Sequence, residues 1–548
     1  MNTDPTDPTD PTGTTGSTGG TAPYVSELRP GHGGFAPLLR AELTKFRTVR
    51  GWAIGLVVAV LATMGLTLLQ HSSCSFNGSD CPSSPVGPDG GAVTDTFYFV
   101  HQPLRGDGSI TVRMTSLTGL YSENGGSPVG AGPGQNPTAG MKPGLQPWGK
   151  AGIIIKDGTA PGSAYAAMMV TGGHGVRMQY DYTHDRPGLA GDVSAASPRW
   201  LRLTRSGDTI TGYDSADGTH WTKVDAVTLA GLPATAQIGL FAASPVHTKV
   251  VSQSLTSQSE TGGPSQITAA IDKLDLQGAK PGGVWAGGQT GGAGGSVYPL
   301  RGGAFRQSGG TLTVTGSGDI APAVPGGPSS GVSLSDTLVG MFAGLIAMVV
   351  VGTVFITSEY RRGLIRTTLT ASPRRGRVLA AKAVVIGAVT FVAGLVAVTG
   401  ALVIGERQMR ADGVSIDPVS TLTLVRIVVG TAALLAVASV LALAIGTVLR
   451  RSAIAVVAVI VAIVLPYFLT VGGVSFLPVG VANWLLRLTP AAAFAIQQPY
   501  PRYAQVAFSY TPPNGYYPLA PWAGFAVLCA WAAVALGLAA FLLRRRDA

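Results

Sequence analysis

The sequence predicts a multi-domain membrane protein, in which a six-helix transmembrane α bundle carries an extracellular all-β sandwich inserted after its first helix. Six apolar runs have about the length that crosses a bilayer. Between the first two runs, many short alternating segments separated by turn residues are typical of a β-sandwich. Charged residues make up 12% of the 548 residues, about half of the roughly 25% usual in soluble proteins, which favours a membrane protein.

The apolar runs are the predicted spans. No Asp, Glu or His lies in the middle of any of them. Ion-driven carriers and channels with charged filters need such groups near the midplane, so the sequence argues against both classes. We expect Arg426, near the outer end of the fourth run, to extend its charged group to the membrane interface. The predicted spans are Trp52–Leu69, Leu338–Ile356, Val378–Ile404, Leu424–Leu449, Ala453–Thr470 and Trp522–Leu543.

Basic residues fix the expected orientation. The loop Thr357–Lys382 contains seven Lys or Arg residues and one acid, Glu359. Short loops of this composition stay in the cytoplasm. Counting spans from this loop places the other basic clusters, Arg450–Arg451 and Arg544–Arg546, on the same side. We therefore expect a multi-pass plasma-membrane protein with both termini in the cytoplasm, in direct contact with the lipid bilayer.

The same loop has helical spacing. Apolar residues recur from Ser358 to Thr370, which predicts a short amphipathic helix on the membrane face, capped by Ser358 and stopped by Pro373. Two interpretations remain open at this point. The arginines only fix topology and touch lipid headgroups, or the helix docks a cytoplasmic partner.

Composition divides the rest of the chain. The N-terminal residues 1–36 have almost no large apolar side chains and are expected to be disordered. Near residues 483–498 we expect a short helix or helical hairpin at the outer leaflet. The predicted domains are 1–36, a disordered cytoplasmic tail; 37–70, an interfacial helix and the first transmembrane helix; 71–94, an extracellular linker; 95–270, the β-sandwich; 271–335, a Gly-rich extracellular segment with extra strands; and 336–548, transmembrane helices two to six.

Sites of other kinds receive little support. Cys74 and Cys81 lie close together in an external polar loop, where they form a disulfide or remain two thiols; two Cys fall short of a zinc site. Residues Gly144–Ala151 fit G-x-x-x-x-G-K but place Ala151 where a phosphate loop needs Ser or Thr. The net charge of +10 gathers beside apolar runs, so no nucleic-acid partner is expected. We expect no catalytic residues, no metal and no enzymatic activity.

Part of the external region resembles a known family. The segments Asp95–Met114, Trp148–Thr171 and Trp200–Val224 look like the concanavalin-like jelly-roll domain of bacterial glycosidases and surface proteins. That domain often binds carbohydrate, so the resemblance implies a cell-wall glycan as one partner. Residues 309–323 look like its opening strands, and either add strands to the sandwich or form a partial second copy. The aromatic residues that would stack on sugars, with core packing as the alternative role, are Trp148, Tyr182, Trp200 and Trp221.

The membrane half is similar to the permease subunit of bacterial type-2 ABC exporters, through Leu38–Trp52, Ile356–Lys382 and Trp484–Gln498. The resemblance implies that this chain binds no cofactor, that ATP is held by a separate cytoplasmic ATP-binding subunit, and that a second permease copy, identical or different, completes the exporter. It also implies that a coupling helix docks on that subunit. The coupling residues would be Glu359, Tyr360, Arg361, Arg362 and Arg366.

The first external loop departs from the family, where it is usually short. An alternative is therefore a non-transporting membrane-anchored carbohydrate-binding or sensor protein. Six spans favour the permease, because one span suffices to anchor a binding module.

Overall fold

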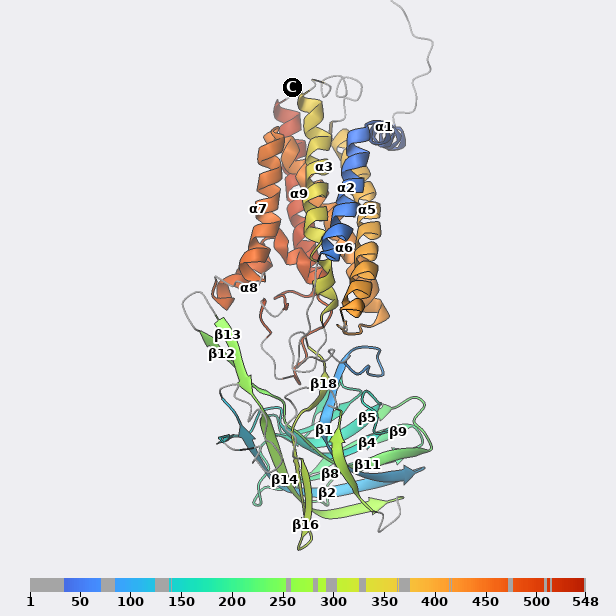
Figure 1. Ribbon diagram of the computed structural model, residues 1–548, viewed down its shortest axis with the longest axis vertical. Coiled ribbons are helices and arrows are strands. Elements are labelled where there is room, and N and C mark those ends of the chain that lie inside the picture. The colour runs from blue at the N-terminus through green and yellow to red at the C-terminus, as the bar shows by residue number, and fades with distance from the viewer. Residues whose placement is uncertain are drawn as a thin grey trace, which may run out of the picture.

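The structure is a computed structural model. It describes residues 34–69, 84–123, 138, 140–252, 258–278, 284–291, 303–324, 332–361, 363, 375–412, 414, 416–471, 477–506, 510–512 and 515–546. The β-sandwich lies at one end of a helical bundle, and helix α1 and the last helix, α9, reach the other end (Figure 1).

Among the described residues, six helices are long and apolar enough to cross a membrane, as the sequence predicts. They are α2 (Arg50–Leu68), α3 (Met341–Arg361), α5 (Arg375–Ala411), α6 (Thr421–Leu449), α7 (Ser452–Thr470) and α9 (Pro521–Arg546). The shorter elements are α1 (Phe35–Thr48), η1 (Leu334–Leu338), α8 (Val479–Leu488) and η2 (Pro490–Gln497). The last two meet at a bend of 97°, close to the helical hairpin expected near residues 483–498.

Small residues let the transmembrane helices approach closely. A Cβ atom on Gly352 of α3 would collide with the main-chain oxygen of Ser439 on α6. On α5, a Cβ on Gly394 would lie 3.1 Å from the Cα of Ala432, also on α6. Helix α6 is therefore packed tightly between α3 and α5, because glycine at these contacts brings the backbones together.

The sandwich consists of two antiparallel sheets and a hairpin. The first sheet has the order β15 (Ala286–Thr290), β1 (Val93–Arg105), β11 (Thr235–Ala243), β4 (Lys150–Lys156), β5 (Tyr165–Thr171), β6 (Val176–Tyr180) and β7 (His184–Pro187), with β18 (Asp319–Pro322) also on β1. The second has the order β10 (Thr222–Thr228), β9 (Thr209–Ser215), β8 (Arg199–Ser206), β2 (Gly108–Tyr121), β14 (Ser265–Gln277), β17 (Thr311–Gly316) and β16 (Ala304–Ser308), with β3 (Lys142–Pro143) on β2. Strands β12 (His247–Ser252) and β13 (Gln258–Gly263) pair with each other.

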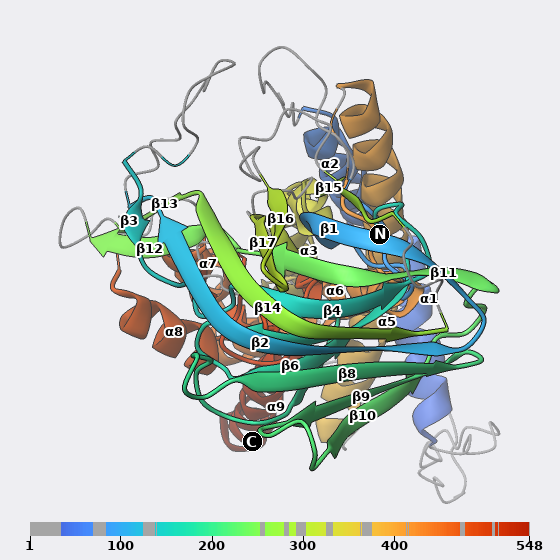
Figure 2. The same cartoon turned by 90° about the horizontal axis from the view of Figure 1, so that it is seen from below.

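Strands from the Gly-rich segment belong to both sheets. Strand β14 pairs with β2 and with β17, whereas β15 and β18 both pair with β1. These strands extend the sandwich from Val93 to Pro322, past the expected end at residue 270. In the part of this segment that the structure describes, the strands add to the same two sheets. Figure 2, seen from below, shows β14 beside β2, followed by β8, β9 and β10.

Two apolar layers stabilise the sandwich. The core between the sheets includes Ile110, Ile153 and Leu201, all 0% exposed. On the other face of the first sheet, a second cluster surrounds Phe97 and Phe241. Alternation along β8 places Leu201 inside and its neighbours outside, which is the period-2 pattern that the sequence shows.

Candidate functional site

A buried charge cluster joins three helices at the end of the bundle away from the sandwich. Lys382 of α5 lies 2.7 Å from Glu42 Oε2 of α1 and 2.6 Å from Glu359 Oε1 of α3. Lys45 of α1 also pairs with Glu359. Both carboxylates and Lys382 are buried, whereas Lys45 is partly exposed. We call Glu42, Lys45, Glu359 and Lys382 the α1–α3–α5 charge cluster.

Local sequence explains how the cluster assembles. Helix α1 is amphipathic, and Glu42 and Phe46 lie one turn apart on its buried face. Phe46 stacks on Trp52, and Trp52 packs edge-on against Phe355 with ring centroids 4.9 Å apart. Glu359 follows Phe355 by one helical turn, and the Lys382 Nζ lies 4.9 Å from the Phe355 ring centroid. The aromatic rings exclude water from ion pairs that are formally neutral in sum, which strengthens them.

The coupling helix does not begin at Ser358, where the sequence predicts its start. Ser358–Arg361 form the last turn of α3, and the Ser358 cap that the sequence predicts is therefore wrong. The transmembrane helix continues because no Gly or Pro interrupts it between Gly352 and Arg361. Glu359 also lies inside the protein, paired with Lys45 and Lys382, and is not an exposed contact in this structure.

The remaining coupling residues have varied surroundings. The ring of Tyr360 lies 5.2 Å from the guanidinium of Arg450, at the end of α6. Arg361 is exposed. Arg362 and Arg366 lie outside the described residues, as do Cys74 and Cys81. Sequence reasoning missed Lys45 and Lys382 as partners of Glu359, and Glu42 as the second partner of Lys382. Glu42 is the one acid in α1, and Lys382 lies within an apolar run.

Two of the four aromatic residues considered for sugar stacking are buried. Trp148 is 6% exposed and stacks on His174 with centroids 4.0 Å apart. The Tyr182 hydroxyl donates to Asp95 Oδ2 at 2.8 Å, and Lys156 Nζ lies 2.8 Å from the same oxygen. Burial lowers the pKa of Lys156, and the Asp95 charge opposes that effect. Trp148 and Tyr182 therefore pack in the interior, the alternative role stated for them.

Trp200 and Trp221 are half-buried on the outer face of the second sheet. The Arg202 guanidinium lies 3.9 Å from the ring centroid of Trp221, and that of Arg113 lies 5.7 Å from Trp200. Register places Trp200 opposite Arg113, so these side chains share one face. Arginines of the protein itself thus cover part of both rings.

The apparent phosphate loop is part of a strand. Lys150 begins β4, is 0% exposed and pairs with Asp319 Oδ1 at 2.8 Å. It also donates to the main-chain oxygen of Ile320 at 2.8 Å. This lysine therefore fastens β18 to the first sheet. In the described part of the chain, no three His, Cys, Asp or Glu side chains converge as metal ligands would.

The sandwich is attached to the bundle by direct contacts. The main-chain nitrogen of Ala92 donates to Pro418 O at 3.0 Å, and Ser84 Oγ donates to Asp417 Oδ1 at 2.7 Å. From the loop before α9, Gln505 Nε2 donates to the main-chain oxygens of Tyr182 and Thr183, at 3.3 and 3.1 Å. The sandwich is consequently held on two separate loops of the bundle.

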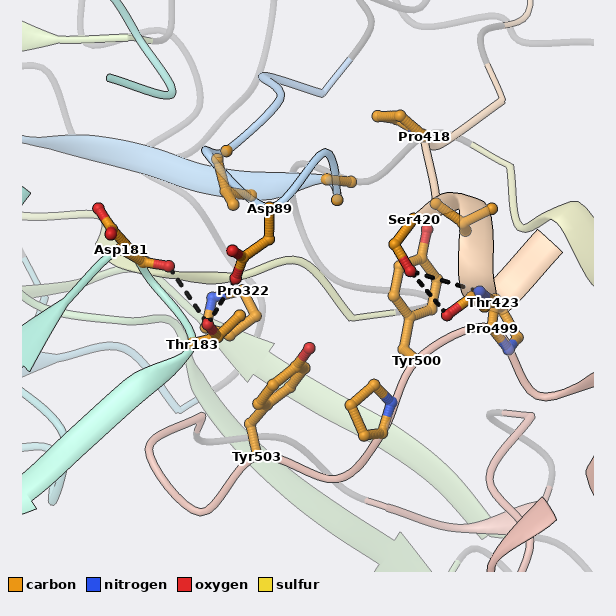
Figure 3. A pocket seen from close by; sticks show the side chains of 16 residues that line it. Asp89, Asp181, Thr183, Pro322, Pro418, Ser420, Thr423, Pro499, Tyr500 and Tyr503 are labelled. Carbon is orange, nitrogen blue, oxygen red and sulfur yellow. Dashed lines mark hydrogen bonds between the residues drawn. The ribbon is translucent and has the colours of Figure 1, made fainter. Parts of the chain in front are cut away.

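Between these contacts lies a cavity of about 340 Å³ (Figure 3). Asp89, Asp181 and Thr183 line it from the sandwich, and Tyr500 and Tyr503 line it from the bundle. Thr183 Oγ1 donates to Asp89 Oδ2 at 3.0 Å. Burial raises the pKa of Asp181, and Asp89 adds to the shift, while burial raises the pKa of Tyr503 to about 12. The joint is therefore polar and acidic on one wall and aromatic on the other.

Comparison with solved structures gives only weak similarities. A functionally unknown protein from Saccharomyces cerevisiae is 14% identical over 34% of this chain and 76% of its own, with a TM-score of 0.18. Scytalido-glutamic peptidase is 7% identical over 40% of this chain and 98% of its own, with a TM-score of 0.23. Peanut lectin is 10% identical over 42% of this chain and 83% of its own, with a TM-score of 0.17.

Comparison with curated proteins finds no match. A family model described as ABC-2 family transporter protein matches residues 210–548, which is more than half of the chain. The match begins within β9 and includes every helix from α3 to α9. The chain therefore belongs to the ABC-2 family of transporter proteins.

Proposed function

We propose that the chain is the transmembrane permease subunit of an ATP-driven transporter, which exports its substrate across the plasma membrane with a separate ATP-binding subunit. The α1–α3–α5 charge cluster is the observation that supports this proposal most strongly. It ties three helices together near the end of α3 and the start of α5, which the Arg-rich connection joins in sequence. A subunit docked at that connection would act on all three helices together.

The orientation follows from charge. Helix α1 and the C-terminal end of α9, which contains Arg544, lie at the end of the bundle away from the sandwich (Figure 1). Arg450 lies against Tyr360 at the end of α3, which also contains Arg361. Arg375 at the start of α5 donates to the main-chain oxygen of Leu543 on α9, so these helix ends meet. The positive-inside rule places this end in the cytoplasm, where ATP is available, and the sandwich outside. Both termini are then cytoplasmic. Export, away from the ATP-binding side, is proposed on the resemblance to type-2 exporters.

Coupling would use the cluster as a rigid joint. Movement of the docked subunit would displace the end of α3. The ion pairs of Glu359 with Lys382 on α5 and with Lys45 on α1 would pass this displacement to those two helices. Buried ion pairs resist separation, because parting them leaves charges without partners in a region of low dielectric. The three helices would therefore move as one body. A second permease copy, identical or different, would supply the other wall of the path.

The first test is extraction of the protein from its native membrane in mild detergent, followed by mass spectrometry of what co-purifies. The proposal expects an ATP-binding protein in near-equal amount, released when the connection is altered. Recovery of cell-wall glycan or a surface protein without an ATP-binding subunit would contradict it, and would favour the membrane-anchored binding module instead.

A further inference from the structure

A groove opens on the outside of the bundle at the end nearest the sandwich. It has a volume of about 370 Å³ and lies between the start of α6 and the start of α9. Its walls are mostly apolar and exposed: Leu422 is 84% exposed, Val425 52% and Trp522 58%. Arg426 is the charged residue among those that line it.

Arg426 is only partly satisfied by the protein. Its Nη2 donates to the main-chain oxygen of Gln498, and its Nε is buried without a hydrogen-bond partner. None of the ion pairs among the described residues includes Arg426. A positive charge in an apolar groove without a counter-ion is costly, so the groove favours an anionic occupant.

The depth of Arg426 matches the headgroup layer. Helix α6 has 29 residues, about 44 Å at 1.5 Å per residue, which exceeds the roughly 30 Å hydrocarbon core by about 14 Å. About 7 Å at each end therefore lies among headgroups. Arg426 is five residues after Thr421, about 8 Å along the helix, and helical side chains lean toward the N-terminus. Its guanidinium thus reaches the boundary between headgroups and acyl chains.

We propose that this groove binds one phospholipid of the leaflet on the sandwich side, with the lipid phosphate on Arg426 and an acyl chain along Val425 and Val429. The planar guanidinium suits a phosphate group, which it can bind with two parallel N–H groups. Trp522 suits the same interface, because indole rings prefer the headgroup level. The site does not depend on the transport function proposed above.

The experiment is native mass spectrometry of the full-length protein in detergent, titrated with phosphatidylglycerol. Wild type should retain one lipid per chain. Arg426→Gln should lower the apparent affinity roughly 10- to 100-fold, because it removes charge-assisted hydrogen bonds to the phosphate. The matched control is Arg407→Gln, which removes an exposed arginine near the same end of the bundle and should bind as wild type. Diacylglycerol with the same chains should bind wild type weakly.

Four other results would overturn the lipid site. Unchanged affinity in Arg426→Gln, or an equal loss in Arg407→Gln, would overturn the site. Displacement of the lipid by millimolar inorganic phosphate would show that the groove recognises free phosphate and not a lipid. Should Arg426→Gln fail to fold, Val425→Trp, which fills the groove and keeps the arginine, should weaken lipid binding as well, and full binding by that variant would overturn the proposal.

Discussion

Replacement of Lys382 by Met should destabilise the protein strongly. Lys382 is 1% exposed and contacts two buried carboxylates, Glu42 and Glu359. Removing one partner from a buried ion pair costs about 3–5 kcal/mol. Lys45 still pairs with Glu359, so Glu42 is the carboxylate left without a partner. We therefore expect a loss near the lower limit, about 3 kcal/mol.

A second substitution should restore part of the stability that Lys382→Met loses. Glu42→Gln together with Lys382→Met removes the unpaired carboxylate and leaves the Lys45–Glu359 pair in place. The double variant should therefore be more stable than Lys382→Met alone, by about 1–3 kcal/mol, the usual size of coupling between neighbouring residues.

Unfolding can be followed by tryptophan fluorescence of the purified protein, because Trp52 lies against Phe355 beside the cluster. The control is Arg47→Gln, which removes one exposed positive charge from the same helix and should change stability little. A double variant no more stable than Lys382→Met would refute the reasoning, since Glu42 and Lys382 would then not be coupled.

Three further predictions concern packing and the joint. Gly352→Ala should cost about 1–3 kcal/mol of folding free energy and reduce the folded yield, because the new methyl group meets Ser439 of α6. Gly65→Ala, with open space around it, is the control and should be tolerated. Equal yields of the two variants by size-exclusion chromatography would contradict the packing. Lys156→Met should lower the melting temperature of the sandwich, because Asp95 loses its buried ion-pair partner at a cost of about 3–5 kcal/mol. Lys223→Met on exposed β10 is the control and should leave the melting temperature unchanged. Equal melting temperatures of the two variants by calorimetry would count against the ion pair. Gln505→Ala should speed proteolysis of the loop before α9, because that loop loses two hydrogen bonds to the sandwich. Arg502→Ala in the same loop is the control and should have the smaller effect. Identical digestion rates of the two variants would show that Gln505 does not attach this loop to the sandwich.

The bundle and the sandwich could be predicted because each rests on a local pattern. Uninterrupted apolar runs specify membrane spans, and alternation such as that of β8 specifies strands with one buried face. The sequence predicts extra strands in and after the Gly-rich segment, but it does not predict which strands they pair with. Their place in the sheets depends on pairing with β1 and β2, far away in the sequence.

The charge cluster was beyond local prediction for a similar reason. Glu42 and Lys382 are 340 positions apart, and nothing in either segment specifies the other. Glu359 therefore looked like the acid of an exposed loop helix. Trp148 and Tyr182 were equally ambiguous, because an aromatic residue near a turn has the same local sequence whether it packs inside or faces solvent. Contacts with residues elsewhere in the chain bury them: Trp148 stacks on His174, and Tyr182 packs against Tyr165.

We propose that the ATP-binding subunit docks at the end of the bundle that contains α1 and the end of α3. The most direct test compares two charge reversals of equal size. Arg361→Glu with Arg362→Glu alters the proposed docking end, and Arg407→Glu with Arg410→Glu alters the end of α5 near the sandwich. After confirming membrane insertion of both variants, the ATP-binding protein that co-purifies with each is quantified. The account predicts that the first variant loses the partner and the second retains it. Retention by both, or equal loss from both, would contradict it.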